Sequence, residues 1–291
     1  MIHMLIKQFS LLFIFLLLIN CKTNYTKTQK HVNIVWDNKE LNEGIIHKSI
    51  LKQELFNSKQ TINVLEIDLR IMNLKPIVVF DGKKFIKPST WGSKLNGMFA
   101  INGNFFDIDN GGSVCYFKRN DTLINNSKPD PEELLFLPML DEGAIAIDAN
   151  ESLHILKKPM AGWETVKNYN TILSSGPLLI WQGNILEQDN IPFITDRHAR
   201  SALGISKNKL FLFVVDGYRQ EASGMTIREL SLMMKSLGCN AAINLDGGGS
   251  STLWVNVGES KGVLNYPSDN EIFDHEGERK VANSLVFTEN N

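Results

Sequence analysis

Cysteine is scarce in this sequence, which excludes a fold held together by disulfides. The 291 residues contain only three cysteines, Cys21, Cys115 and Cys239, whereas small disulfide-stabilised domains are dense in them. No CxxC or HExxH spacing occurs, so a structural zinc site is not supported. Cys115 and Cys239 could pair or stay buried as small apolar residues, and the apolar neighbours Ala241–Ile243 favour burial for Cys239.

The sequence also lacks an excess of charge of one sign. Its 30 Lys and Arg face 32 Asp and Glu, and no long basic run could follow a phosphate backbone, so nucleic acid is not an expected partner. The six histidines, at positions 3, 31, 47, 154, 198 and 275, are mostly isolated, which disfavours a metal-dependent phosphoesterase with clustered His and Asp ligands. We expect no cofactor and no catalytic metal. A structural calcium ion stays open, because such sites have no fixed spacing outside the EF-hand.

Long hydrophobic runs are missing as well, and the longest lies near the amino terminus. Lys7 precedes the apolar run from Phe9 to Ile19, which is too short to span a bilayer comfortably but suits an export signal. Cys21 follows directly, as in the lipidation motif of bacterial lipoproteins, although Asn20 replaces the usual small residue. The alternatives are an uncleaved anchor or simple secretion, and all three place the rest of the chain outside the cytoplasm.

These observations predict the organisation of the chain. Residues 1–20 are expected to be a signal peptide, and residues 21–32 a lipid-anchored Cys21 followed by a polar tether rich in Lys, Thr and Asn. Residues 33–291 contain no Pro/Ser-rich linker and no repeat, which favours a single domain. The predicted location is the bacterial cell envelope, with the membrane as a partner through the lipid anchor.

The pattern of apolar residues predicts an α+β fold, a mixed twisted β-sheet core with a few helices. Alternation from Leu65 to Leu69 is typical of a strand with one wet face. The apolar run Leu210–Val215 predicts a strand, Thr226–Leu237 a helix with a Thr226/Glu229 capping box, and Ala241–Leu245 another strand. We interpret residues 209–246 as a βαβ-like unit with parallel neighbouring strands. Short apolar runs elsewhere also predict strands: Pro76–Phe80, Met98–Ile101, Gly143–Ile147, Leu178–Trp181, Ala202–Ile205, Thr252–Val255 and Val281–Phe287.

Two aspartates follow the two strands of this unit and are the first candidates for chemistry. Asp216 and Asp246 would emerge at the same edge of the sheet, with Asn244 on the face of Asp246. A pair of carboxylates suits work on an acetal-like carbon. The simpler interpretation is that each aspartate opens a turn, since both precede glycine.

Further candidates lie in polar segments beside apolar runs. A glycine-rich segment could bring backbone amides close to a phosphate or form an ordinary turn; it consists of Gly247, Gly248, Gly249 and Ser250. The Gly-Lys-Ser/Thr ending of a P-loop is absent. Arg200 or Arg279 could fork onto a phosphate, or be solvated. His198 could be a polar loop residue, and Asn102 either opens a hairpin turn or offers its amide to a sugar.

Together, these segments and their order resemble the phosphodiester glycosidase family. The likeness covers roughly Met98 to Phe287, and Asp-Gly-Gly-Gly-Ser after an apolar strand is its most specific part. The family usually has Pro and Thr at the positions of Ala199 and Ser201, so the identity of the substrate does not carry over. The segments that carry the resemblance are Phe99-Ala100-Ile101-Asn102-Gly103, Ser175-Gly176-Pro177, His198-Ala199-Arg200-Ser201-Ala202, Val214-Val215-Asp216-Gly217, Gly224-Met225-Thr226, Asn244-Leu245-Asp246-Gly247-Gly248-Gly249-Ser250-Ser251 and Arg279-Lys280-Val281-Ala282-Asn283.

The resemblance implies a hydrolase that releases a sugar from a sugar-1-phosphodiester of an exported glycan or glycoconjugate, by cleavage at the anomeric carbon. It implies Asp246 as nucleophile or base with Asp216 as its partner, although their order is open, and Arg200 as a cation that holds the phosphate. The substrate-binding set that it implies is Asn102, Asn244, Gly247, Gly248, Gly249, Ser250, Arg279 and His198.

A non-catalytic glycan-binding surface lipoprotein is the alternative from another class. The presence of both Asp246 and Arg200 favours catalysis over that alternative. The sugar, the group beyond the phosphate, the stereochemical outcome and the oligomeric state are not fixed by the sequence.

Overall fold

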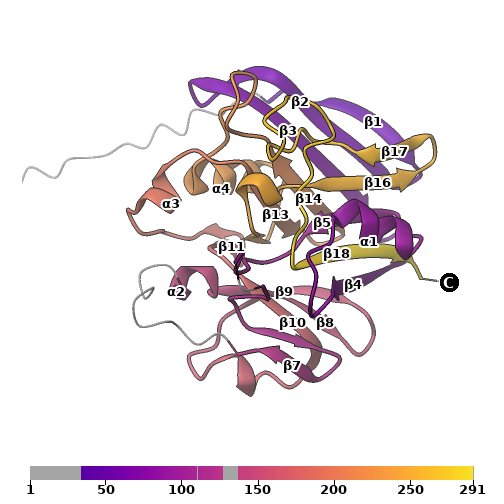
Figure 1. Cartoon of the computed structure of the whole chain (residues 1–291), viewed down its shortest axis with the longest axis vertical. Helices are drawn as coiled ribbons and strands as arrows, with labels where there is room; N and C mark the ends of the chain where they lie inside the picture. Colours follow the sequence, from indigo (N-terminus) through magenta and orange to yellow (C-terminus); the bar gives the residue numbers. More distant parts are fainter. Residues whose placement is uncertain (1–33, 110, 127–136, 291) are drawn as a thin grey trace, which may run out of the picture. The chain divides into compact units, whose positions relative to one another are not determined.

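Short apolar runs between turn residues become strands throughout the computed structural model (Figure 1), which describes residues 34–109, 111–126 and 137–290. Residues Ile34–Asn291 form one unit. The predicted signal peptide, Cys21 and the tether lie outside the described residues. Within the described part of the chain, no helix is long and apolar enough to cross a membrane.

The described strands form three sheets, and every strand pair in them is antiparallel. The first sheet has the order β1 (Asp37–Asn42), β2 (Ile45–Leu55), β3 (Ser58–Asp68), β14 (Lys209–Val215), β13 (Arg200–Ile205), β15 (Ala241–Asn244), β11 (Leu178–Trp181) and β12 (Asn184–Ile185). The second has β17 (Ser260–Val263), β16 (Leu253–Val257), β5 (Phe99–Asn102), β18 (Asn283–Glu289) and β4 (Leu74–Phe80). The third has β7 (Thr122–Asn125), β6 (Phe117–Arg119), β10 (Tyr169–Ser175), β8 (Gly143–Asp148) and β9 (Leu153–Lys157).

The predicted α+β class with a βαβ-like unit over residues 209–246 is wrong, because the described fold is built mainly from antiparallel β-sheet. Strand β13 lies between β14 and β15 and pairs antiparallel with both. The reason is local: β13 and β14 form a tight hairpin closed by a hydrogen bond from the Ser206 N–H to the Lys209 carbonyl (2.9 Å). This hairpin occupies the edge of β14 that a parallel β15 would need. Both strands still end at the same edge of the sheet, so Asp216 and Asp246 lie there as expected.

The helices of the described chain are short and cover the outer faces of the sheets. The capping box predicted for α4 (Ile227–Ser236) is confirmed, with Thr226 as the N-cap and Glu229 bonding back to it. Helix α4 packs on the first sheet, and α1 (Pro88–Lys94) lies on the second sheet (Figure 1). Trp91 of α1 packs in one apolar cluster with Trp254 of that sheet. The remaining short elements are α2 (Leu137–Leu140), α3 (Pro192–Thr195) and the 3₁₀ turns η1 (Trp163–Thr165) and η2 (Gly248–Ser250).

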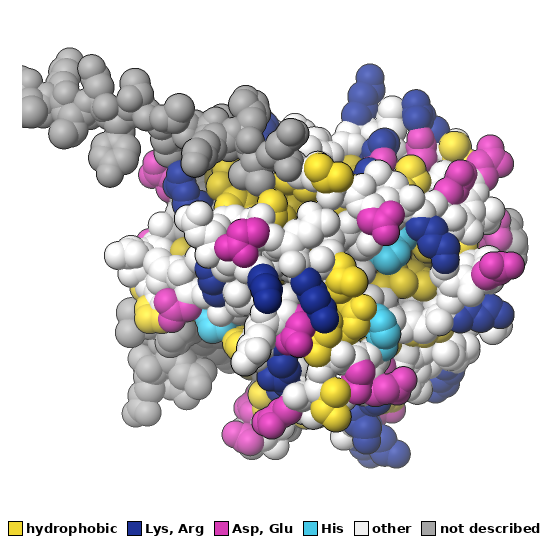
Figure 2. Space-filling model, turned by 90° about the horizontal axis from the view of Figure 1, so that it is seen from above, with side chains coloured by type: hydrophobic (Ala, Val, Ile, Leu, Met, Phe, Trp, Pro, Cys, Tyr) yellow, Lys and Arg dark blue, Asp and Glu magenta, His cyan; other side chains and the backbone are white. Residues whose placement is uncertain are grey.

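One apolar core is shared by all three sheets. It includes Leu212 of the first sheet, Ile101 of the second and Ile145 of the third, all fully buried. Cys115 and Cys239 are both buried and not joined to each other. Figure 2 shows Lys and Arg side chains interspersed with Asp and Glu on one face of the molecule, so no field of a single sign dominates the part of that face drawn in colour.

Candidate active site

The Asp246–Ser250 turn carries the chain from the first sheet to the second. Asp246 follows β15, and its N–H donates to the Gly103 carbonyl (3.0 Å) at the end of β5. Two residues later the Gly248 N–H donates to the Ala199 carbonyl (2.9 Å), just before β13. The turn η2 then leads into β16, which pairs with β5 in the second sheet. This turn is therefore fixed on both sides by backbone from distant parts of the chain.

Asn102 ties the same turn to its neighbours through a buried side-chain amide. Its Nδ2 donates to the Asp246 carbonyl (2.7 Å), and its Oδ1 accepts from the Ser201 hydroxyl (2.7 Å) and the Thr252 N–H (3.2 Å). The side chain has no exposed surface. Its described contacts are all with protein, so its predicted contact with a sugar stays a prediction.

Asn244 plays a similar part on the other side of β15. Its Nδ2 donates to the carbonyls of Gly176 and Leu245, both at 2.8 Å, while the Ser175 hydroxyl donates to the Asn244 carbonyl (2.9 Å). The Asn244 Oδ1 is buried and has no hydrogen-bond partner among the described residues. The side chain and the backbone of Asn244 thereby join the segment Ser175–Pro177 to the residue that precedes the Asp246 turn.

The Asp246 carboxyl lies at the edge of this hydrogen-bond network and is partly buried. Its Oδ1 accepts a hydrogen bond from the Gly247 N–H (2.8 Å). Burial raises the pKa of Asp246 to about 6, and the Ser250 hydroxyl, the Gly247 N–H and the positive charge of Arg279 hold it from rising further. The Ser250 hydroxyl is itself buried and has no hydrogen bond of normal geometry in the described structure. A carboxyl with this pKa is ionised at neutral pH and can act as a base or nucleophile.

Arg279 brings a cation to the glycines of the turn. Its Nε and Nη2 donate to Asp269 Oδ1 (2.8 and 2.6 Å), and the guanidinium remains partly exposed. A Cβ atom at Gly249 would lie 2.4 Å from the Arg279 Nη2, so only glycine permits this approach. Gly248 has φ +61°, a conformation that favours glycine. The residue types of the turn are thus required by the packing of Arg279 and by the backbone.

His198 and Tyr218 form a pair next to the turn. The His198 Nδ1 and the Tyr218 hydroxyl are 2.8 Å apart, and their rings meet edge to face at 5.8 Å. Burial raises the pKa of Tyr218; the positive charge of Arg200 opposes this rise, and the Asp246 charge adds to it. Burial lowers the pKa of His198, and the positive charge of Arg200 lowers it further. Tyr218 has φ +62°, which is uncommon for a residue other than glycine. Sequence reasoning missed Tyr218, whose only signal is its place two residues after Asp216.

Asp216 reaches the same sheet edge but has different surroundings. Its Oδ1 accepts hydrogen bonds from the Asn265 Nδ2 and the Tyr266 N–H, both at 2.9 Å. Its Oδ2 is buried without a partner among the described residues, and burial raises its pKa to about 7. None of these contacts is shared with Asp246. Among the described residues, no group of three or more His, Cys, Asp or Glu side chains could hold a metal ion.

Arg200 is almost fully buried, and its guanidinium faces backbone carbonyls. It donates to the carbonyls of Phe193 (2.6 Å), Met225 (3.1 Å) and Asp196 (3.2 Å), and it lies 4.8 Å from the Phe193 ring. Burial lowers its pKa to about 10, so it stays positively charged at neutral pH. The contact of Arg200 with a phosphate stays a prediction. Its electrostatic effect on His198 and Tyr218 shows that its charge is felt beside the turn.

Comparisons with known proteins agree on the fold. A family model described as phosphodiester glycosidase matches residues 96–288. The catalytic domain of zebrafish N-acetylglucosamine-1-phosphodiester alpha-N-acetylglucosaminidase, auto-inhibited by its pro-peptide, is 22% identical with a TM-score of 0.64, covering 90% of this chain and 86% of that one. A hypothetical protein from Synechocystis is 15% identical (TM-score 0.62; 88% and 64% covered). A Burkholderia pseudomallei protein whose name describes it as exported is 16% identical (TM-score 0.52; 80% and 74% covered). No curated protein sequence matches.

Proposed function

The chain belongs to the phosphodiester glycosidase family, and from this membership we propose that it hydrolyses a sugar-1-phosphodiester between the anomeric carbon and the phosphate oxygen. One observation carries the proposal: the Asp246 carboxyl begins a turn of three glycines, and the Arg279 guanidinium lies against Gly249 of the same turn, where a Cβ atom would be 2.4 Å from its Nη2. The turn thus combines a carboxylate for the sugar carbon with donors for a phosphate. These are the two requirements of the reaction.

The chemistry follows from the charge that develops during cleavage. The bond from the anomeric carbon to oxygen breaks, its electron pair leaves with the phosphate, and the carbon becomes oxocarbenium-like. Arg279 stabilises the departing phosphate, which needs little protonation because it is a stable anion. The Gly247 and Gly248 N–H groups are engaged within the protein, by the Asp246 carboxylate and the Ala199 carbonyl. Asp246 faces the carbon, either attacking it directly or taking a proton from water. The products are a free sugar and a phosphomonoester.

The other site residues divide by their contacts. We assign Asn102 and Asn244 to positioning, because their described hydrogen bonds hold protein segments around the turn. We assign Arg200 and Asp216 to the surrounding fold, because their described hydrogen bonds go to residues outside the turn. The His198–Tyr218 pair borders the turn, and Tyr218 is partly exposed, which supports a contact with the sugar or the phosphate. The Asp246 turn can thus be rigid before the substrate arrives.

The test is the variant Asp246→Asn with a sugar-1-phosphodiester in water enriched in heavy oxygen. Wild-type protein should place the heavy oxygen on the released sugar, and the variant should be slower by about 10²–10⁴-fold, the usual range for a lost acid–base group. Asp121→Asn, at an exposed position on the turn after β6, is the matched control and should keep full activity. Heavy oxygen in the phosphate, or normal turnover by Asp246→Asn, would refute the proposal.

Absence of turnover with retained substrate binding would favour the alternative, a glycan-binding module.

We also propose export and lipidation at Cys21, supported by the signal-like sequence of residues 1–20 and by the name of the similar Burkholderia protein. Expression with a labelled fatty acid should mark wild-type protein but not Cys21→Ser. Equal labelling of both would contradict lipidation at Cys21.

A further inference from the structure

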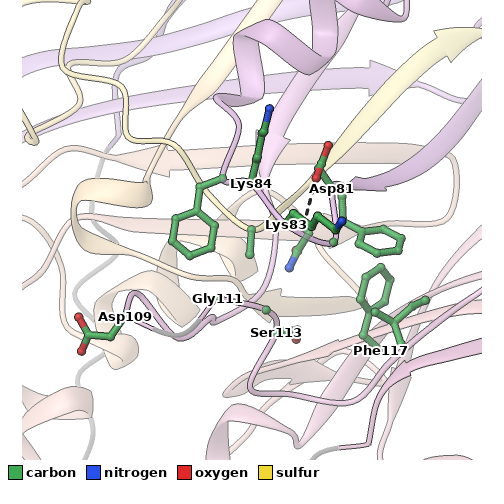
Figure 3. Close-up of a pocket in the computed structure, with 14 residues that line it drawn as sticks. Asp81, Lys83, Lys84, Asp109, Gly111, Ser113 and Phe117 are labelled. Atoms are coloured by element: carbon green, nitrogen blue, oxygen red, sulfur yellow. Dashed lines mark hydrogen bonds between the residues drawn. The ribbon is translucent and has the colours of Figure 1, made fainter.

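A cavity lies between the loop after β4 and the loop after β5 (Figure 3). Its volume is about 410 Å³, and its lining includes Phe85, Lys83 and Asn283. Asp246, Arg279 and the glycines of the turn do not line it. Two backbone hydrogen bonds connect the sites: the Gly103 N–H donates to the Asn283 carbonyl, and the Asp246 N–H donates to the Gly103 carbonyl, both at 3.0 Å. The cavity is therefore a separate space, whose wall is joined to the turn through the backbone of Gly103 and Asn283.

The charged side chains that line the cavity point in different directions. In Figure 3 the Lys83 side chain extends toward the Gly111–Ser113 segment, whereas Lys84 points away from that segment. Asp81 is turned back onto its own loop, where its Oδ1 accepts from the Lys83 N–H (3.0 Å). The Asp109 carboxylate points away from Ser113 (Figure 3). The lining carries two lysines and two aspartates and so has balanced charge, and Lys83 is the lysine of this lining that is directed toward the opposite loop.

The walls of the cavity add an aromatic surface and open backbone. Phe85 is held by an edge-to-face contact with Phe106, with ring centroids 4.9 Å apart. Cβ atoms built at Gly82 and Gly112 would meet nothing within 4 Å, so the backbone faces open space at both glycines. Aromatic rings bind the apolar face of a sugar, and a lysine ammonium binds its acidic group.

We propose that this cavity binds an anionic sugar unit of the substrate, with the ring on Phe85 and a carboxylate or phosphate at Lys83. The inference rests on the proposed function, since it takes the substrate to be a glycan that extends beyond the bond cleaved at Asp246. Asn283 lies in the wall of the cavity and is joined to the Asp246 turn through Gly103.

Binding can be tested without turnover by calorimetry on the full-length Asp246→Asn protein. The probes are a trimer of galacturonic acid, glucose 6-phosphate and the neutral trimer of glucose. Both acidic probes should bind and the neutral trimer should bind at least about tenfold more weakly, because it cannot form the charge-assisted hydrogen bond to Lys83. Binding of only one acidic probe would identify the carboxylate or the phosphate as the group recognised.

Adding Lys83→Gln to the Asp246→Asn protein should weaken acidic-probe binding about tenfold, while adding Lys84→Gln, the neighbour that points away, should not. Phe85→Leu should weaken it as well, with folding checked by circular dichroism. Equal binding of acidic and neutral trimers, or equal effects of the two lysine variants, would overturn the inference. Because the binding measurement needs no turnover, its failure can be told apart from a failure of the proposed hydrolysis. If the wild-type protein hydrolyses its substrate but Lys83→Gln does not weaken acidic-probe binding, only the inference about this cavity is refuted.

Discussion

Replacing Asp216 by asparagine should stabilise the protein at neutral and alkaline pH. The Asp216 side chain is 2% exposed, and its Oδ2 has no hydrogen-bond partner in the described structure. Burial raises its pKa from 3.8 to about 7. Since each pKa unit corresponds to about 1.4 kcal/mol, ionising this carboxyl costs the folded protein about 4 kcal/mol. An asparagine can keep the two hydrogen bonds that Oδ1 accepts and never carries the charge.

The pH dependence gives this prediction its sign. Below about pH 4 the carboxyl is protonated in the folded and the unfolded chain, so it does not penalise the wild-type protein. Between about pH 4 and pH 7 the unfolded chain binds fewer protons than the folded protein, so the wild-type free energy of unfolding falls with rising pH. Above pH 7 both states are ionised and the difference levels off. The advantage of Asp216→Asn should therefore grow from near zero to about 4 kcal/mol.

Urea unfolding followed by tryptophan fluorescence at acidic, neutral and mildly alkaline pH measures this difference. Asp121→Asn, on an exposed turn, should show no such pH dependence. An advantage of Asp216→Asn that does not change with pH, or a loss of stability at pH 8, would refute the account of a buried neutral acid. The same variant should retain hydrolytic activity, because Asp216 contacts Asn265 and Tyr266 rather than the Asp246 turn.

Three other outcomes test the turn. Gly249→Ala should raise KM about tenfold by displacing Arg279, which costs a charge-assisted hydrogen bond to phosphate; steady-state kinetics with an unchanged KM would contradict this. Asn102→Ala should lower the free energy of unfolding by about 2–4 kcal/mol, since three buried hydrogen bonds are lost, and urea titration measures it. The pH profile of kcat/KM should fall tenfold per unit below about pH 6, where Asp246 becomes protonated; a flat profile to pH 5 would contradict a required Asp246 carboxylate with this pKa.

Local elements of the fold could be predicted from the sequence, whereas strand pairing could not. The capping box of α4 is a contact within four residues, and the apolar run of β14 depends only on burial. The neighbour of β14 depends instead on the β13 hairpin. Apolar runs occur on both sides of β14 in the sequence, at Ala202–Ile205 and Ala241–Leu245, and apolar character alone does not decide which of them pairs with it. The wet face predicted for β3 is also wrong, because Glu66 is buried beneath Lys48 and Lys209. Lys48 lies on the neighbouring strand β2, whereas Lys209 comes from β14, which is distant in the sequence.

Residues within the candidate site divide in the same way. Asp246, its glycines and Arg279 occur in segments with a recognisable order, and the structure brings them together. Asn265, Asp269 and Tyr218 are single polar residues in loops, and nothing in their neighbours predicts a role. Their partners are 10 to 49 residues away along the chain. Residue spacing in the sequence does not reveal such pairs, because the conformation of the loops determines which side chains meet.

The crossing between two sheets explains why the site depends on buried asparagines. At the Asp246 turn the backbone leaves one ladder before it joins the next, so its polar groups need other partners. Side-chain amides of Asn102, Asn244, Asn265 and Asn283 bond backbone groups in or beside this turn. An amide both donates and accepts, so each can join two segments that a serine or an aspartate would join less completely. The position of the Asp246 carboxyl is therefore set by groups that need not touch the substrate, and replacing any of them should lower kcat before it changes KM.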